Sequence, residues 1–399
     1  MKTLRHILAL LALWFSVSAS AKPVDISFEF LGYPLRLKAD TELFNKEPVA
    51  LSEESFHQWF SRQLTPEQDE LVGSLLELKE KFRLDDWLYY QLIRRAAGSI
   101  SPKARDYTLY TLCKWFLLTR SGYDASIKTD GSRILFYVRT DDNIYNIPYY
   151  TKEGRQYVCL NYHDYGNQID FAASIFRESG LPVPNSCKPF SYRITYLPAF
   201  NGNGWEERDI RFPYYQTDYH FRIRVNPEIK TMFANYPVMD YGASFNTPLS
   251  QETYRSLIPL LKENTRTMSI KAGVDYLMRF TRYAFMFKPD GENFGMEKRL
   301  TPEQTLLYAE SDCEDRAALF FYLVKEIYNL PMIVLAYPKH VTIAVKFDKP
   351  VGRPVIYNGE KYSVCEPTPQ QEDLAMGQLI PSLTKTRYEV VYAYQPSRQ

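Results

Sequence analysis

Three side chains in the last third of the chain have the chemical types that thiol-based acyl transfer requires. Cys313 supplies a nucleophile, His340 a base, and Glu366 an acid that can orient the base. Cys313 precedes a helical pattern, His340 begins a strand pattern, and Glu366 follows a later strand pattern. The sequence therefore predicts a nucleophile, base and acid carried by three separate elements.

The residues around Cys313 predict the start of a helix. Ser311 is followed three residues later by Glu314, a capping-box pattern that makes Ser311 the expected N-cap. Backbone N–H groups and the macrodipole of the first turn favour a thiolate at Cys313. The carboxylates of Asp312, Glu314 and Asp315 oppose this effect, because like charge disfavours the thiolate.

Two strands and a hairpin are expected after this helix. Residues 332–337 are apolar and β-prone, and residues 340–347 alternate so that Val341, Ile343 and Val345 face a core while His340 faces away from it. The turn at 358–359 is Asn-Gly, which suits a two-residue hairpin loop, and the strand that follows places Cys365 toward the core.

Three short runs resemble the transglutaminase-like cysteine peptidase superfamily, whose fold is papain-like: SDCEDRA at 311–317, YPKH at 337–340 and CEPT at 365–368. The resemblance extends over roughly residues 267–381 and is closest to exported bacterial members. It implies that Cys313 is the nucleophile, His340 the general base, and Glu366 the acid. Glu366 occupies the position where the family usually has an aspartate, and its side chain is one methylene longer.

The resemblance also bears on metal binding. In the bacterial members, carboxylates beside the cysteine can hold calcium, which makes Asp312, Glu314 and Asp315 candidate ligands. The alternative is that these carboxylates cap the helix N-terminus and complement its dipole. We adopt the capping interpretation, assign no metal ligand, and expect no other cofactor.

The first 21 residues have the features of a secretory signal. Lys2 and Arg5 precede an apolar run at 7–17, and Ala-Ser-Ala at 19–21 is a cleavage motif. We expect cleavage after Ala21 and location in the periplasm or outside the cell. No later run of about 18 apolar residues predicts a membrane span, and a net charge of +1 argues against nucleic acid as a partner.

A chain of 399 residues exceeds one typical core. We interpret 22–188 as an N-terminal α+β domain, 189–249 as a β-rich spacer, and 250–399 as the transglutaminase-like domain. In the first of these, helices are expected over 52–62, 66–82, 85–97 and 103–120, and strands over 133–139, 143–149 and 156–160.

The N-terminal α+β domain contains two short segments that parallel segments of the C-terminal domain. Residues 112–122 parallel 319–330 and residues 154–159 parallel 359–365, which suggests a degenerate copy of the C-terminal domain. The triad positions of that copy would fall near Arg105, Ser132 and Leu160, none of which has the required chemistry. The alternative is independent packing of helices followed by strands.

Five cysteines leave four if Cys313 is a free thiol. In an oxidising compartment these four allow up to two disulfides, although the sequence does not fix the pairing; they are Cys113, Cys159, Cys187 and Cys365.

The sequence therefore predicts an α+β protein that is an exported cysteine peptidase or amidase. It would act through a thioester on a peptide or protein substrate in the cell envelope. Two alternatives remain open: an acyl transferase in which an amine intercepts the thioester and cross-links proteins, and a non-catalytic envelope binding or scaffold protein.

Overall fold

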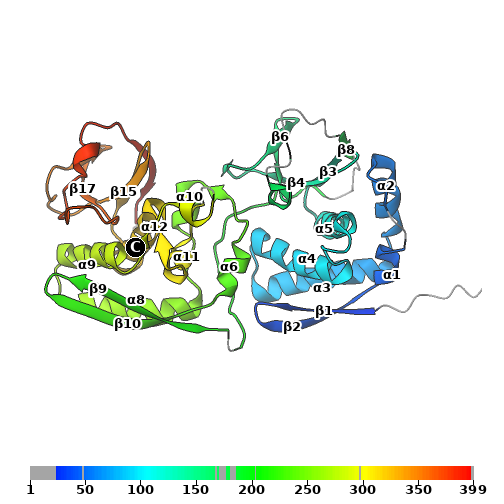
Figure 1. Ribbon diagram of the computed structural model, residues 1–399, viewed down its shortest axis with the longest axis horizontal. Coiled ribbons are helices and arrows are strands. Elements are labelled where there is room, and N and C mark those ends of the chain that lie inside the picture. Colours follow the sequence, from blue (N-terminus) through cyan, green and yellow to red (C-terminus); the bar gives the residue numbers. More distant parts are fainter. Residues whose placement is uncertain are drawn as a thin grey trace, which may run out of the picture.

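The computed structural model describes residues 24–46, 49–166, 169, 177–179, 186–202, 204–295 and 298–396. The predicted signal peptide, residues 1–21, lies outside the described residues. The protein is α+β, as predicted: helices combine with sheets whose strand pairs are antiparallel, apart from one short parallel pair. Figure 1 shows two units side by side, each with a β-hairpin on one side, helices in the middle and a larger sheet on the other side.

The N-terminal unit runs from the first hairpin to the last strand of its sheet. Its elements are β1 (Val24–Phe30), β2 (Tyr33–Ala39), α1 (Thr41–Phe44), α2 (Glu53–Arg62), α3 (Pro66–Phe82), α4 (Asp86–Ile100), α5 (Tyr107–Arg120), β3 (Ala125–Thr129), β4 (Ile134–Thr140), β5 (Ile144–Tyr145), β6 (Tyr149–Lys152), β7 (Arg155–Cys159) and β8 (Arg177–Ser179).

The C-terminal unit contains the three residues predicted to do chemistry. Its elements are β9 (Glu206–Tyr214), β10 (Thr217–Val225), α6 (Glu228–Met232), β11 (Val238–Met239), α7 (Tyr241–Phe245), α8 (Gln251–Thr265), α9 (Ile270–Tyr283), β12 (Met286–Phe287), α10 (Asp290–Asn293), α11 (Pro302–Leu307), β13 (Glu310–Ser311), α12 (Cys313–Tyr328), β14 (Met332–Tyr337), β15 (His340–Val345), β16 (Val355–Tyr357), β17 (Glu360–Cys365) and β18 (Glu389–Tyr394).

The two five-stranded sheets have the same strand order. The N-terminal sheet reads β6-β7-β4-β3-β8 and the C-terminal sheet reads β16-β17-β15-β14-β18, so each strand of one has a counterpart at the same place in the other. In each unit one long helix, α5 or α12, precedes the first strand of the sheet. The hairpins correspond as well: β1 and β2 contact α4 and α3, whereas β9 and β10 contact α9 and α8.

The segment predicted as a β-rich spacer, residues 189–249, contains the hairpin β9–β10. Its strands lie against α9 and α8, so the hairpin is packed onto the C-terminal unit. Short helices α6 and α7 and the two-residue strand β11 complete the segment.

Both faces of the C-terminal sheet are covered. Val341, Ile343 and Val345 lie in the main core, into which α12 also packs, while Ala344 lies in a smaller core on the opposite face. The alternation predicted for this strand is thus confirmed, and each of its buried aliphatic side chains contributes about 1.5–3 kcal/mol. The predicted Asn-Gly turn is confirmed too, since Asn358 and Gly359 have φ angles of 49° and 79°.

All five cysteines are free thiols, so the structure contains neither of the two disulfides that the count allowed. Cys113, Cys159 and Cys365 are buried, and Cys187 is exposed. Among the described residues, no helix combines the length and apolar character that a bilayer crossing demands.

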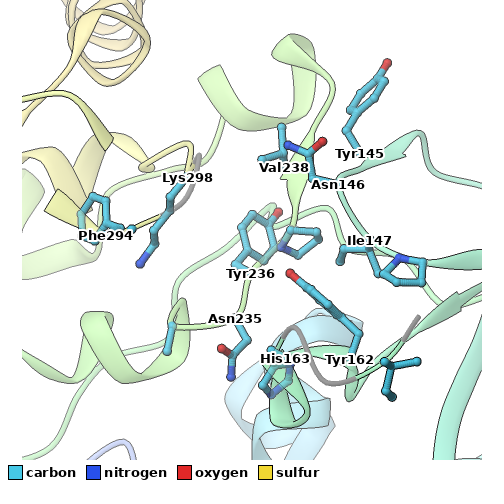
Figure 2. A pocket seen from close by; sticks show the side chains of 16 residues that line it. Tyr145, Asn146, Ile147, Tyr162, His163, Asn235, Tyr236, Val238, Phe294 and Lys298 are labelled. Carbon is cyan, nitrogen blue, oxygen red and sulfur yellow. The ribbon is translucent and has the colours of Figure 1, made fainter. Parts of the chain in front are cut away.

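A cavity of about 580 Å³ lies where the two units meet. Figure 2 shows Tyr145 and Ile147 from the N-terminal unit on one side of it, and Phe294 and Lys298 from the C-terminal unit on the other.

Candidate active site

Cys313 is the first residue of α12, as expected, but the cap of this helix is shifted by one residue. Asp312 is the N-cap, and its carboxylate accepts the N–H groups of Glu314 and Asp315 at 2.9 and 3.3 Å. The Asp315 carboxylate accepts the N–H of Asp312 in return. The prediction of a Ser311–Glu314 capping box is therefore wrong, because Ser311 belongs to β13 and is paired with Phe287 of β12.

His340 and Glu366 contact each other directly. Nε2 of His340 lies 2.8 Å from Oε2 of Glu366, and the carboxylate is 1 % exposed. Its other oxygen, Oε1, accepts the N–H of Thr368 at 2.8 Å. Because Nε2 donates its proton to the carboxylate, Nδ1 of His340 carries the lone pair that can accept a proton.

The thiol of Cys313 lies beside the start of β15. Its sulfur accepts a hydrogen bond from the backbone N–H of Val341, the residue after His340, and is close enough to Glu366 to feel its charge. The structure thus places the Cys313 sulfur beside the residue that follows His340, and the His340 ring beside Glu366, although no hydrogen bond joins the sulfur to the ring among the described residues. Sequence reasoning did not anticipate the contact with Val341, because a backbone donor has no signature in side-chain types.

Electrostatics at Cys313 differ from the sequence-based expectation. Burial raises the pKa of the thiol, and the charges of Asp312, Glu314 and Glu366 raise it further, while the Val341 N–H lowers it. The expected preference for thiolate at the helix N-terminus is therefore outweighed. The resting thiol is protonated at neutral pH, and attack requires a base that removes its proton.

Arg282 in α9 fixes the backbone beside the acid. Its guanidinium is 2 % exposed and donates to the carbonyl oxygens of Glu366 and Leu374 and to the carboxylate of Asp373. Sequence reasoning missed Arg282, because an arginine within a helical pattern carries no signature of the oxygens that it contacts. No spacing in the sequence connects Arg282 with Asp373.

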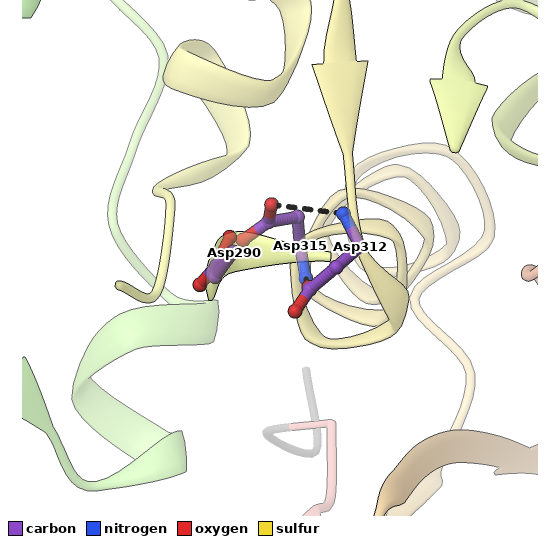
Figure 3. Close-up of side chains that lie close together, drawn as sticks. All are labelled: Asp290, Asp312 and Asp315. Carbon is purple, nitrogen blue, oxygen red and sulfur yellow. Dashed lines mark hydrogen bonds between the residues drawn. The ribbon is translucent and has the colours of Figure 1, made fainter. Parts of the chain in front are cut away.

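The three carboxylates that the resemblance made candidate calcium ligands do not lie together. Glu314 turns away to Arg299, whose Nε lies 2.8 Å from it, and accepts the hydroxyl of Tyr241. Asp290 instead joins Asp312 and Asp315, with one oxygen of each within 4.8 Å of the others (Figure 3).

Backbone groups already engage this cluster. Asp315 accepts the N–H groups of Leu300 and Asp312 as well as capping α12, and burial holds the pKa of its carboxyl well above the usual range. Clustered oxygens suit a hard cation, but these carboxylates already accept backbone N–H groups from the cap of α12 and from residues 298 and 300. We assign no metal to the cluster.

The matching positions of the N-terminal unit carry different residues. Tyr107 begins α5 as Cys313 begins α12, and Ile134 begins β4 as His340 begins β15. Tyr137 pairs with Cys159 in the same register as Ile343 with Cys365, which places Leu160 opposite Glu366. By this correspondence the matching positions are Tyr107, Ile134 and Leu160, close to the positions near Arg105, Ser132 and Leu160 that the sequence suggested. The hydroxyl of Tyr107 donates to Asp164 at 2.8 Å.

Comparison of the chain with protein-family models, with curated proteins and with solved structures found no match. The interpretation of the site therefore depends on its own geometry and on the short runs of sequence that carry it.

Proposed function

We propose that this protein is an exported cysteine peptidase or amidase of transglutaminase-like type, in which Cys313, His340 and Glu366 form the triad. The observation that carries the proposal is the position of the His340 ring: one nitrogen is bonded to a buried carboxylate, and the residue that follows donates its N–H to the Cys313 sulfur. That arrangement leaves the other nitrogen as the base for the thiol.

The reaction follows from these contacts. Nδ1 of His340 takes the thiol proton while the sulfur bonds to the carbonyl carbon of an amide, and Glu366 stabilises the resulting imidazolium. The imidazolium then protonates the departing amine, and the C–N bond breaks to leave a thioester on Cys313. Water, deprotonated by the same imidazole, hydrolyses the thioester to a carboxylic acid and restores the thiol.

The backbone N–H of Cys313 is placed to stabilise the negative charge that develops on the carbonyl oxygen when the sulfur attacks. The N–H groups of a helical first turn lack intrahelical partners, and no hydrogen bond is recorded for this one within the described part of the chain. It is therefore available to the oxyanion of the tetrahedral intermediate.

The proposal includes a papain-like core and a degenerate second copy. Support for the core comes from α12 packed against an antiparallel sheet that contributes the base, and support for the copy comes from the identical strand order of the two sheets. In that copy Tyr107, Ile134 and Leu160 replace the reactive groups, so its remaining roles are to brace the active unit and to contact substrate.

One observation favours a non-catalytic envelope binding protein as the second candidate. The pKa of the Cys313 thiol is raised by burial and by nearby carboxylates, as expected for an inert buried cysteine. The two functions differ in whether His340 changes the reactivity of that thiol.

The products of turnover test the proposed function. A mixture of tryptic peptides is incubated with residues 22–399 and with monodansylcadaverine as an amine acceptor, and the products are identified by mass spectrometry. Hydrolysis yields new peptide termini or deamidated side chains, whereas acyl transfer yields dansylated peptides. Both kinds of product must disappear in Cys313→Ala and persist in Cys187→Ala, which removes an exposed thiol; product formation by Cys313→Ala contradicts the proposal.

A further inference from the structure

The cavity between the units is lined by aromatic rings, amides and one ammonium group. Figure 2 shows the hydroxyl of Tyr162 directed toward the ring of Tyr236, with Asn235 near His163 and with Lys298 on the side of Phe294. The hydroxyl of Tyr236 itself donates to the carbonyl oxygen of Tyr192. No aspartate or glutamate belongs to its described lining. A volume of about 580 Å³ is in the range of pockets that enclose a drug-sized ligand.

A two-stranded ribbon forms one rim of the cavity. Tyr145 pairs with Val238 and Ile144 with Met239, which joins β5 of the N-terminal unit to β11 of the C-terminal unit. The described sheet has only these two strands, so each strand has one edge without a neighbouring strand. An exposed strand edge can pair with an extended peptide through its main-chain groups.

Two polar side chains in the lining have unused hydrogen-bonding capacity. Nε2 of His163 lies 3.2 Å from Asp164, whereas its Nδ1 is buried without a partner. Burial lowers the pKa of His163, so the ring is neutral and Nδ1 is an acceptor, as an amide N–H requires. Lys298 makes no ion pair with any carboxylate in the described ranges. Burial lowers its pKa, and its ammonium lies 4.8 Å from the centroid of the Phe294 ring, so a ligand carboxylate would supply the opposite charge that the site lacks.

Two segments of the cavity wall lead to the first turn of α12. The N–H of Lys298 donates to Asp290, and that of Leu300 donates to Asp315 in this turn. From the ribbon, the chain continues past Val238 to Tyr241, whose hydroxyl donates to Glu314 beside the reactive thiol. These contacts link the cavity wall to the helix turn that carries Cys313.

We propose that the cavity binds an acidic peptide segment, whose extended backbone pairs with the β5–β11 ribbon and whose carboxylate meets Lys298. The neutral ring of His163 accepts one peptide N–H. An acidic peptide would then be the substrate class of the proposed peptidase or amidase. Cleavage of the bound peptide rests on that proposed function, whereas binding of the peptide does not.

Binding is measured by fluorescence anisotropy with residues 22–399 carrying Cys313→Ala, so that no turnover occurs. The probes are two fluorescein-labelled hexapeptides, Thr-Glu-Val-Asp-Thr-Glu and its amide counterpart Thr-Gln-Val-Asn-Thr-Gln. The variants are Lys298→Glu and Lys298→Met, and the matched control is Lys349→Glu, which reverses an exposed charge outside the cavity lining. Trigalacturonate, an acidic sugar, serves as a competitor.

We expect the acidic peptide to bind at least about tenfold more tightly than the amide peptide, as for a charge-assisted hydrogen bond. Lys298→Met should remove that preference, Lys298→Glu should reverse it, and Lys349→Glu should retain it. Equal binding of the two peptides, or an unchanged preference in Lys298→Met, overturns the proposal, as does stronger binding of trigalacturonate than of the peptide. Since Cys313 is absent throughout, failure here leaves the proposed chemistry standing, and failure of turnover leaves the binding result standing.

Discussion

Glu366 uses both oxygens of its carboxylate. One oxygen bonds to His340 and the other to the N–H of Thr368, while Arg282 holds its carbonyl oxygen. The longer side chain is accommodated because the carboxylate folds back toward the chain that follows it. The acid is therefore fixed by the backbone N–H of Thr368 and by the guanidinium of Arg282, which is what orientation of an imidazole requires.

Removal of the charge on Glu366 should slow the reaction of Cys313. In Glu366→Gln the imidazolium that forms when His340 takes the thiol proton loses the buried carboxylate that stabilises its charge. We expect alkylation of Cys313 by iodoacetamide at pH 7 to fall roughly tenfold to a thousandfold, as measured by mass spectrometry against the exposed Cys187. Glu366→Asp, which keeps the charge, should lie in between; an unchanged rate in Glu366→Gln would show that the acid does not act on the base.

Lys114 makes the free energy of unfolding depend on pH. Burial lowers the pKa of this lysine to about 7, and its side chain is 1 % exposed among aromatic rings. Above pH 7 the unfolded chain binds a proton that the folded protein does not, so this group makes stability rise by about 1.4 kcal/mol per pH unit up to its unfolded pKa near 10.4.

The substitution Lys114→Met removes this pH-dependent contribution to the free energy of unfolding. We expect the variant to be more stable than the wild type at pH 7 and the difference to shrink as pH rises to 9, measured by urea unfolding. Lys349→Met, at an exposed position, should show a constant difference. A gap between Lys114→Met and wild type that does not change with pH would mean that Lys114 is charged in the folded protein.

At the level of elements, the sequence predicted helices and strands correctly where the buried residues repeat with the period of the element. The helices expected over 52–62 and 66–82 are α2 and α3, and the alternation of β15 is confirmed. The single strand expected over 143–149 is wrong. The chain forms the short strand β5, which pairs with β11, then turns at Asn146, whose φ is 61°, before β6 begins. That pairing joins segments more than 90 residues apart, so no local pattern reveals it.

The site was predictable in its residue types but not in its energetics. The order of cysteine, histidine and acid, each at the boundary of an element, could be read from short motifs. The raised pKa of Cys313 could not, because it depends on burial that only tertiary packing creates. The N-cap is Asp312 and not the predicted Ser311, because Ser311 is paired in β13 with a strand that is distant in the sequence.

Two glycines in helix interiors should respond oppositely to alanine. A Cβ at Gly273 in α9 would lie 1.6 Å from the hydroxyl of Tyr328 at the end of α12, whereas nothing lies within 4 Å of a Cβ at Gly73 in α3. We expect Gly73→Ala to stabilise by about 0.5–1 kcal/mol and Gly273→Ala to destabilise by about 1–3 kcal/mol.

Urea unfolding measures both glycine substitutions. Combination of Gly273→Ala with Tyr328→Ala should restore part of the loss, because the overlapping ring is removed. If Gly273→Ala is as stable as Gly73→Ala, the close approach of α9 and α12 is not present in solution.

At the level of the whole molecule, the two units share one strand order and meet over a specific contact. Trp87 of α4 donates its indole N–H to the carbonyl of Met232 at 2.9 Å and packs on Tyr236 with ring centroids 5.4 Å apart. These partners belong to the C-terminal unit, whereas Trp87 belongs to the N-terminal one. The cavity with Tyr236 in its wall exists only because the units are joined in this way.

Truncation of Trp87 should weaken the whole protein. We expect Trp87→Ala to lower the free energy of unfolding by about 3–5 kcal/mol and Trp87→Phe, which keeps a ring but loses the N–H, by about 1–2 kcal/mol. Differential scanning calorimetry should also show the single transition of the wild type separating into two in Trp87→Ala. A loss in Trp87→Ala no greater than that in Trp87→Phe would show that the ring does not hold the units together.

The most direct test of the triad is the rate of Cys313 alkylation by iodoacetamide from pH 5 to 10 in wild type and His340→Ala, with Cys187 in the same protein as the reference. Because burial and nearby carboxylates raise the pKa of the Cys313 thiol, His340→Ala should react slowly until well above pH 8.5, the value of an ordinary cysteine. The account predicts that wild-type Cys313 reacts at pH 7 at least about tenfold faster than in His340→Ala, because the imidazole takes the proton. Identical profiles for Cys313 in the two proteins would contradict the account.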